Sequence, residues 1–227
     1  VVPDDGSMFD LYGGNFKFDD PVVIINNQAD CFIDFHNSMT LLSITMATVN
    51  LNTFSGGFVR NVKEGQIRLI SSMFCLNIIG DFLCSSSHAF VLIHSTHFLN
   101  NVGKIIDCKK GILSCHFSVF NSSSAMPIIQ LTELKYEKSE IVSSQFFTAS
   151  KGHMIAVESS DVYVLYSHFS QSNNDVVSPG VSCQYCIYGQ HRKGIFQIST
   201  IHFALFAVTL GFGVILIDAC RFCKQII

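Results

Sequence analysis

Short apolar runs alternate with short polar stretches along most of this chain. Residues 152–174, GHMIAVESSDVYVLYSHFSQSNN, are representative, with an apolar run, a polar corner, an alternating strand from Val162 to Phe169 and an Asn-rich turn. β-branched and aromatic residues fill the runs, while Asn, Asp, Gly and Ser fill the gaps, as in strands and turns. Helical periodicity is not sustained. The pattern predicts an all-β protein.

The strand-like runs end in phenylalanine at nearly regular intervals. These marker residues are Phe54, Phe74, Phe98, Phe120, Phe146, Phe169, Phe203 and Phe222. Six of the seven steps between them lie within a few residues of 23, and the remaining step is 34. A unit of this length with two or three short strands cannot cover its own apolar face, so neighbouring units must stack. We therefore expect a right-handed parallel β-helix of seven to eight coils.

Stacking coils would bring equivalent residues into rows. The rows predict an internal aromatic stack of Phe74, Phe98, Phe120, Phe146 and Phe169. Residues 1–40 are expected to form an irregular N-terminal cap or opening coil, residues 41–182 the main coils, and residues 183–227 the final coils and cap. Within these segments, residues 22–25, 31–35 and 41–51 read as single strand runs.

Two segments resemble the coils of a known β-helix family. GHMIAVESSDVYVLYSHFSQSNN and GKIIDCKKGILSCHFSVFNSS are similar to coils of the polymorphic outer membrane protein type and its protist relatives, which carry a GGAI-like strand and an FxxN-like strand end. Phe98 to Asn101 fits FxxN, and Gly152 to Ile155 fits the glycine strand with His153 at the second Gly. The resemblance covers roughly residues 40–180 and implies a surface or adhesive role.

Charge and composition narrow the range of partners. Charged residues make up only 14% of the chain and the formal net charge is −3. Basic residues do not cluster beyond Lys109-Lys110 and Arg192-Lys193, which argues against nucleic-acid binding. The chain has no Trp, which weakens a simple lectin hypothesis. A protein or glycan partner fits these features, and no cofactor is expected.

The segment 195–217, IFQISTIHFALFAVTLGFGVILI, carries no formal charge. Its length can span a bilayer, so membrane association through a transmembrane helix is one prediction for it. The favoured alternative is two further coils, because FQISTIHF and VILIDACRF both fit the strand-end pattern.

Nine cysteines leave at least one thiol free or paired outside the chain. Two CxxC pairs, Cys183/Cys186 and Cys220/Cys223, have the ligand chemistry of a tetrahedral zinc site. The intervening segment is long and apolar, and Cys220 stands where Ser usually ends a strand, so a core position is favoured and a disulfide is an alternative ahead of zinc. We assign no metal and keep the four as candidates. Cys84 and Cys108 lie about one coil apart and are expected to stack as inert core thiols.

Four His-Phe dipeptides also recur, with their histidines expected to flank an inward Phe and point outward. They are His97-Phe98, His116-Phe117, His168-Phe169 and His202-Phe203. Polysaccharide lyases and polygalacturonases built on this fold need acidic residues that converge in one groove. No such set is evident among Asp19, Asp20, Asp107, Asp161, Glu133, Glu137 and Glu140, so no catalytic or cofactor-binding residue is predicted. Asn121-Ser122-Ser123 is a candidate N-glycosylation site in an exported chain.

The sequence thus predicts a non-enzymatic, adhesin-like β-helix segment at the cell surface or outside the cell, with membrane anchoring through residues 195–217 as one possibility. An intracellular structural solenoid in a larger assembly is one alternative. A carbohydrate-active enzyme of the pectin lyase-like type is the other, and it would require converging carboxylates.

Overall fold

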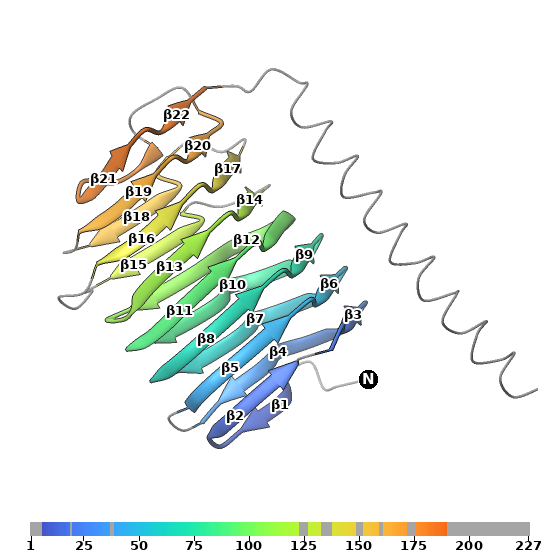
Figure 1. Cartoon of the computed structure of the whole chain (residues 1–227). Coiled ribbons are helices and arrows are strands. Elements are labelled where there is room, and N and C mark those ends of the chain that lie inside the picture. The colour runs from blue at the N-terminus through green and yellow to red at the C-terminus, as the bar shows by residue number, and fades with distance from the viewer. Residues whose placement is uncertain are drawn as a thin grey trace, which may run out of the picture. The chain divides into compact units, whose positions relative to one another are not determined.

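The chain folds as a parallel β-solenoid (Figure 1). The structure, a computed structural model, describes residues 6–18, 20–36, 39–122, 127–132, 138–148, 152–158, 161–171 and 176–189. The solenoid has about six turns, and equivalent positions lie about 24 residues apart. This spacing confirms the all-β coil architecture expected from the Phe markers. Phe203 and Phe222, which brought the expected number of coils to seven or eight, lie outside the described residues.

Each turn supplies strands to three faces, which we call A, B and C. On face A the strands pair in parallel in the order β1 (Ser7–Leu11), β4 (Gln28–Phe35), β7 (Thr53–Val62), β10 (Ile78–Ser87), the second half of β12 (His97–Lys109), β15 (Ile129–Thr132) and β18 (Ile155–Glu158).

Face B is an eight-stranded parallel sheet. Its order is β2 (Gly14–Phe18), β5 (Met39–Thr45), β8 (Gly65–Ile70), β11 (Ala89–His94), β13 (Ile112–His116), β16 (Ser139–Val142), β19 (Val162–Leu165) and β21 (Val181–Gln184). Inward residues alternate with outward ones along these strands, for example in Ala89–His94, where three of six are buried. The alternation follows from the two-residue period of a strand.

Face C carries the shortest strands. They are β3 (Val23–Ile25), β6 (Thr48–Asn50), β9 (Met73–Cys75), the first half of β12, β14 (Val119–Ser122), β17 (Gln145–Thr148), β20 (His168–Phe169) and β22 (Ile187–Tyr188). β12 runs continuously from face C to face A, so these two faces share one network of hydrogen-bonded strands.

The predicted aromatic stack lies on the inner side of face C. The rings of Phe74, Phe98, Phe120, Phe146 and Phe169 are fully buried and stack with successive centroid distances of 5.2, 5.0, 4.9 and 5.1 Å. Tyr188 continues the stack. Parallel register forces the stacking, because each Phe pairs directly with the Phe of the next turn. Burial of each ring contributes about 2 to 3 kcal/mol.

Polar ladders fill the corners between the faces. Between faces C and A, the backbone N–H groups of Asn27, Asn52 and Asn77 each donate to the side-chain oxygen of the asparagine one turn further on, at 2.9, 3.0 and 3.0 Å. The third acceptor in this row is Asn101. Buried polar groups must be paired inside the protein, and an asparagine can both donate and accept, so one residue type repeats at this corner.

A second ladder lies between faces B and C. Its hydroxyl groups accept from the backbone N–H of the preceding turn and belong to Ser72, Ser118, Ser144 and Ser167. The residue before each ladder position has a positive φ, as in Ser71, Ser95, Phe117, Ser143 and Tyr166. One left-handed residue per turn bends the chain sharply from face B into face C.

Residues 7–35 supply strands to all three faces, so the solenoid begins within the segment expected to be an irregular cap or opening coil. Two other expectations about the chain pattern are corrected by the structure. Residues 41–51 are divided at Met46, whose φ is 56°. The marker Phe54 does not lie in the same row as the later Phe markers. It pairs with Ile79 on face A, and the residue beside Phe74 on face C is Val49.

Candidate functional site

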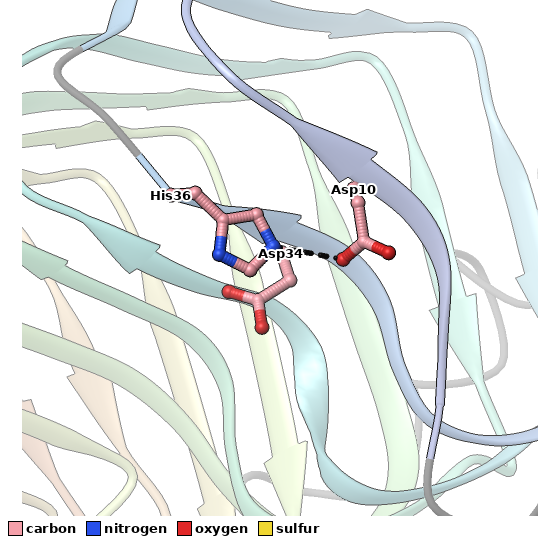
Figure 2. A group of neighbouring side chains, drawn as sticks. All are labelled: Asp10, Asp34 and His36. Carbon is pink, nitrogen blue, oxygen red and sulfur yellow. Dashed lines mark hydrogen bonds and ion pairs between the residues drawn. The ribbon is translucent and has the colours of Figure 1, made fainter.

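Charged residues converge on the outer side of face A in the first three turns. Asp10 on β1 pairs in register with Asp34 on β4, and Asp34 pairs with Arg60 on β7. Asp30 lies on the same strand as Asp34, and His36 follows that strand directly. Figure 2 shows the imidazole of His36 and the carboxyls of Asp10 and Asp34 facing one another. We call these five residues the acidic cluster.

Arg60 holds two of the acids. Its Nε and Nη2 lie 2.8 and 2.7 Å from Oδ2 of Asp34, and its Nη1 forms an ion pair with Asp30. The Asp34 side chain is only 5% exposed and lies directly against this guanidinium. Double contact from one arginine to a buried carboxylate is a strong, oriented interaction.

The third acid of the cluster, Asp10, is held by a serine hydroxyl and an imidazole. Oδ1 of Asp10 accepts from the Ser7 hydroxyl at 2.5 Å and lies 2.9 Å from Nε2 of His36. The imidazole in turn stacks on the ring of Tyr12 with a centroid distance of 4.8 Å. Hydrogen bonding to Ser7 and then to His36 lowers the pKa of Asp10 below its usual value.

Asp30 is stabilised as a carboxylate as well. The Ser55 hydroxyl donates to its Oδ1 at 2.8 Å, and this bond, followed by the bond from Arg60, lowers the pKa of Asp30. The hydrogen bond to Asp34 raises the pKa of Arg60. Asp10 and Asp30 are therefore ionised and Arg60 protonated at neutral pH. The ion pairs of Arg60 join the second and third turns, and the contact between Asp10 and His36 links the first turn to them.

Three members of the acidic cluster have metal-ligand chemistry. One ligand atom each from Asp10, Asp34 and His36 can be chosen so that all three lie within 4.8 Å of one another. Two carboxylates and an imidazole suit a divalent ion such as Zn²⁺ or Mn²⁺. Arg60 already forms an ion pair with Asp34, however, and Nε2 of His36 already lies 2.9 Å from Oδ1 of Asp10. A cation would therefore have to compete with the existing ion pairs.

Sequence reasoning missed the acidic cluster although a signal was present. Asp10, Asp34 and Arg60 follow one another at 24 and 26 residues, which is one turn of the solenoid. The Phe markers that indicate the period begin at Phe54 and do not reach Asp10.

A second polar group lies on face B. Nε2 of His116 is 3.0 Å from both the Ser114 hydroxyl and Oε1 of Glu140, and Ser114 donates to the same Glu140 oxygen at 3.2 Å. A Ser-His-acid triad needs the acid and the serine on opposite nitrogens of the imidazole. Here both approach the same nitrogen, so the geometry does not support serine activation.

The histidines of the His-Phe dipeptides are divided between two faces. His97 and His168 flank the inward Phe98 and Phe169 on face C, and His168 itself is buried. His116 instead pairs with His94 on face B, and Phe117 is an exposed corner residue. His202 lies outside the described residues. The described histidines of these dipeptides thus form no single row.

The two cysteines of the first CxxC pair lie together on the last described turn, with Cys183 on β21 and Cys186 at the following corner. Cys220 and Cys223 lie outside the described residues, so the four-cysteine site stays a prediction. Cys84 and Cys108 are both buried, yet Cys84 pairs with Ile106 and Cys108 with Ser86. They are offset by two residues and do not form the stack expected from their spacing.

The sequon residue Asn121 lies on β14 with its side chain partly exposed. It stands between Leu99 and Phe147 in the outer row of face C. Glycosylation at Asn121 stays a prediction.

Comparison with known proteins identifies no relative of this chain. No family model, curated protein or solved structure gives a significant match to the chain. Among the residues that the structure describes, no helix has the length and apolar character needed to cross a bilayer. The segment 195–217 lies outside those residues.

Proposed function

We propose that this chain is a non-enzymatic, adhesin-like β-helix segment of the cell surface that binds a protein partner along one edge of the solenoid. The observation that carries the proposal is a row of exposed aliphatic side chains at the corner between faces C and A. It consists of Ile25, Leu51, Leu76, Ile78 and Val102, and we call it the aliphatic ridge.

The aliphatic ridge contains two pairs of side chains that stack on neighbouring turns. Leu51 and Leu76 occupy the same left-handed corner position in successive turns, and they are 53% and 47% exposed. Ile78 and Val102 pair directly in register and are 52% and 43% exposed. Neighbouring turns lie about 4.8 Å apart, so these side chains form a contiguous surface. Single exposed apolar residues are ordinary, whereas contiguous ones mark interaction sites.

The chemistry of the ridge favours a protein over a glycan. Sugars are bound by exposed aromatic faces and by polar groups that match their hydroxyls, and the ridge consists of Ile, Leu and Val. Apolar, uncharged surface is typical of the centre of protein interfaces. The similarity of the coils to the polymorphic outer membrane protein type, carried by Phe98 to Asn101 and Gly152 to Ile155, supports a surface location.

The interface can be tested with matched baits. Immobilised wild-type chain, a Leu51→Ser/Leu76→Ser variant and a Tyr166→Ser/Tyr185→Ser control would be exposed to detergent extracts of surface-labelled cells. Tyr166 and Tyr185 are exposed aromatic residues at the other edge of face C, the corner between faces B and C. We expect a protein that is retained by the wild type and the control and is lost from the ridge variant. Equal retention by all three baits would refute the role of the ridge.

Location is a separate question with its own measurement. Antibody against the chain should label intact cells, and glycosidase treatment should lower the mass of the protein unless Asn121 is changed to Gln. Labelling only after permeabilisation, without a glycan, would favour the intracellular structural solenoid.

One observation favours a pectin lyase-like enzyme as the second candidate. Partial burial and then the nearby Asp81 raise the pKa of Asp107 on β12, as a general acid requires. Asp34 cannot be its paired acid, because it lies three strands away, about 14 Å at about 4.8 Å per strand, beyond the roughly 6.5 to 9.5 Å between paired acids of inverting glycosidases. The nearby acid is Asp81. Cleavage of polygalacturonate that Asp107→Asn abolishes, with the fold intact, would establish the enzyme and overturn the proposal.

A further inference from the structure

The last described turn repeats the corner geometry of the earlier turns with sulfur in place of oxygen. Cys186 occupies the ladder position held by Ser118, Ser144 and Ser167. Ser167 donates to the carbonyl two residues earlier, Leu165 O, at 3.0 Å. The Sγ of Cys186 lies 3.6 Å from the equivalent carbonyl, Gln184 O, and 3.4 Å from Val164 O, one turn back. The residue before it, Tyr185, has a φ of 56°.

Cys183 lies on the inward row of face B that contains Cys115, Ile141 and Val164. An inward residue at this position reaches the ladder residue at the next corner. In the turn of Cys115, the thiol lies within hydrogen-bonding reach of Ser118 and is 3.8 Å from the hydroxyl of Ser144. In the last turn the corresponding ladder residue is Cys186, so the fold brings two thiols into contact.

Two donors converge on the sulfur of Cys183. The thiol of Cys186 and the hydroxyl of Tyr188 both hydrogen-bond to it, and these bonds lower the pKa of Cys183 to about 6. The same contact raises the pKa of Cys186. At neutral pH the pair therefore holds one thiolate and one thiol, the arrangement that starts thiol–disulfide exchange.

The other buried cysteines behave differently. Burial raises the pKa values of Cys31, Cys84, Cys108 and Cys115, which are enclosed in the core. Cys183 and Cys186 are only partly buried. Among the described cysteines, this pair combines a stabilised thiolate, a neighbouring thiol and access to solvent.

We propose that Cys183 and Cys186 form a redox-active dithiol that exchanges with low-molecular-weight disulfides and closes to a reversible protein disulfide. The Cys183 thiolate attacks one sulfur of the external disulfide, whose S–S bond breaks and releases one thiolate. Cys186 loses its proton to solvent and attacks the Cys183 sulfur of the mixed disulfide, which releases the second thiolate. The two protein thiols are oxidised to one disulfide, and the external disulfide is reduced to two thiols.

This site is independent of the aliphatic ridge, which lies on the earlier turns at another corner. It concerns the chemistry of the chain in a changing redox environment and does not require the partner interaction. Loss of either function would therefore leave the other measurable.

The first test uses the reduced, full-length wild-type chain. Brief alkylation with iodoacetamide at neutral pH, followed by tryptic mapping, should modify Cys183 at least about tenfold faster than Cys115, because only the thiolate reacts. Cleavage after Lys151 and Arg192 gives a peptide, residues 152–192, in which Cys183 and Cys186 are the only cysteines. Oxidised glutathione should make this peptide lighter by two hydrogen atoms.

Three variants separate the roles. Cys186→Ser should halt the reaction at a glutathione adduct on Cys183, since the second attack is lost. Tyr188→Phe should move the pH profile of Cys183 alkylation to higher pH, whereas a Cys115→Ser control should leave it unchanged. Circular dichroism would establish that each variant is folded.

The proposal fails if Cys183 in the native wild-type chain reacts no faster than Cys115, or if peptide 152–192 stays reduced while the redox buffer oxidises other cysteines. It also fails if chelation of Zn²⁺ is needed before Cys183 reacts, because that result would assign the thiols to a metal site.

Discussion

Each buried corner asparagine serves two turns at once. The side-chain oxygen of Asn77 accepts from the backbone and side-chain N–H groups of Asn52, both at 3.0 Å. Its amide donates to Val49 O at 3.0 Å and to Asn101 at 2.9 Å. All four bonds connect to other turns, so this one side chain links the hydrogen-bond networks of neighbouring coils.

Replacing Asn77 with Ala should lower the free energy of unfolding by about 2 to 4 kcal/mol, because buried donors and acceptors lose their partners. Urea unfolding would measure the loss. The exposed Asn15 on β2 is the control, and Asn15→Ala should change stability by no more than about 0.5 kcal/mol. Equal effects at the two positions would refute the corner ladder as a stabilising element.

The acidic cluster predicts acid sensitivity. The pKa values of Asp10 and Asp30 are lowered in the folded chain below the ordinary 3.8. Their contribution to stability is therefore fully present above pH 3.8 and is lost as the pH falls through the folded-state pKa values. The bonds from Ser7 and His36 to Asp10, and from Ser55 and Arg60 to Asp30, cause this dependence.

Arg60→Gln should reduce stability at neutral pH by about 2 kcal/mol, because Asp34 keeps a buried charge without its guanidinium. The same change should reduce the acid sensitivity without abolishing it, since the Ser55 bond to Asp30 remains. Thermal unfolding between pH 2.5 and pH 7 would measure both effects. Lys17→Gln removes an exposed positive charge from the same part of the chain and should alter neither; a matching loss there would point to net charge instead.

Glycines allow the strands of face A to approach closely where the register shifts. Register breaks occur between Ile78 and Phe82 on β10 and between Cys84 and Ser86. Gly103, in the facing part of β12, has a φ of +116°, and a Cβ there would lie 2.4 Å from the carbonyl oxygen of Ile79. Both the backbone conformation and the close approach therefore require glycine.

Gly103→Ala should destabilise the chain by more than about 2 kcal/mol, since it combines a disfavoured φ with a clash against backbone. Gly14 is the matched control, because its φ is +88° and a Cβ there would have no atom within 4 Å. Gly14→Ala should cost only the conformational strain, about 1 kcal/mol. If both changes cost the same in thermal unfolding, the close approach is not a constraint.

The strands and their period could be predicted because they depend on local alternation and on repeated Phe residues. The division of residues 41–51 could not, because Met46 gives no turn signal. Its left-handed φ is imposed by stacking, where its N–H donates to Ile70 O of the next turn at 3.0 Å. Leu51 adopts the same conformation and donates to Cys75 O. Such corners are fixed by the neighbouring coil and leave little trace in the local sequence.

The candidate sites, too, could be predicted from the sequence only in part. Asp10, Asp34 and Arg60 could have been aligned from their spacing, because register carries equivalent residues to one row. The bonds of Arg60 to Asp30 and Asp34 depend on side-chain rotamers, which the period does not specify. The Cys183–Cys186 contact needed the corner geometry, since a CxxC spacing alone fits a core position, a disulfide or a metal site.

Across the molecule, each turn contacts mainly the turns on either side. Stability of such an array is approximately a sum of single turns and nearest-neighbour interfaces. Removing one complete repeat, residues 96–117, joins Ser95 directly to Ser118, which then takes the position of Thr96. Phe120 takes the position of Phe98 beside Phe74, so the rows of Phe and Ser residues keep their register.

Deleting residues 96–117, one full turn, should give a folded chain of lower stability. Deleting only residues 96–106 removes the face C strand and part of its face A continuation but leaves the face B strand Ile112–His116, and it should prevent cooperative folding. Circular dichroism and urea unfolding would distinguish the two products. Folding of both deletions, or of neither, would contradict the nearest-neighbour description.

The hydrogen bonds between turns determine how this protein would respond to mechanical load. In a parallel solenoid they run along the stacking direction, so force applied between the first and last turns acts on all interfaces in series, and the coils separate one after another as single interfaces fail. About 24 residues per turn, at about 3.4 Å of extended chain each, release about 80 Å at every step. The solenoid would therefore lengthen in small, repeated increments and dissipate tension that would break a single rigid attachment.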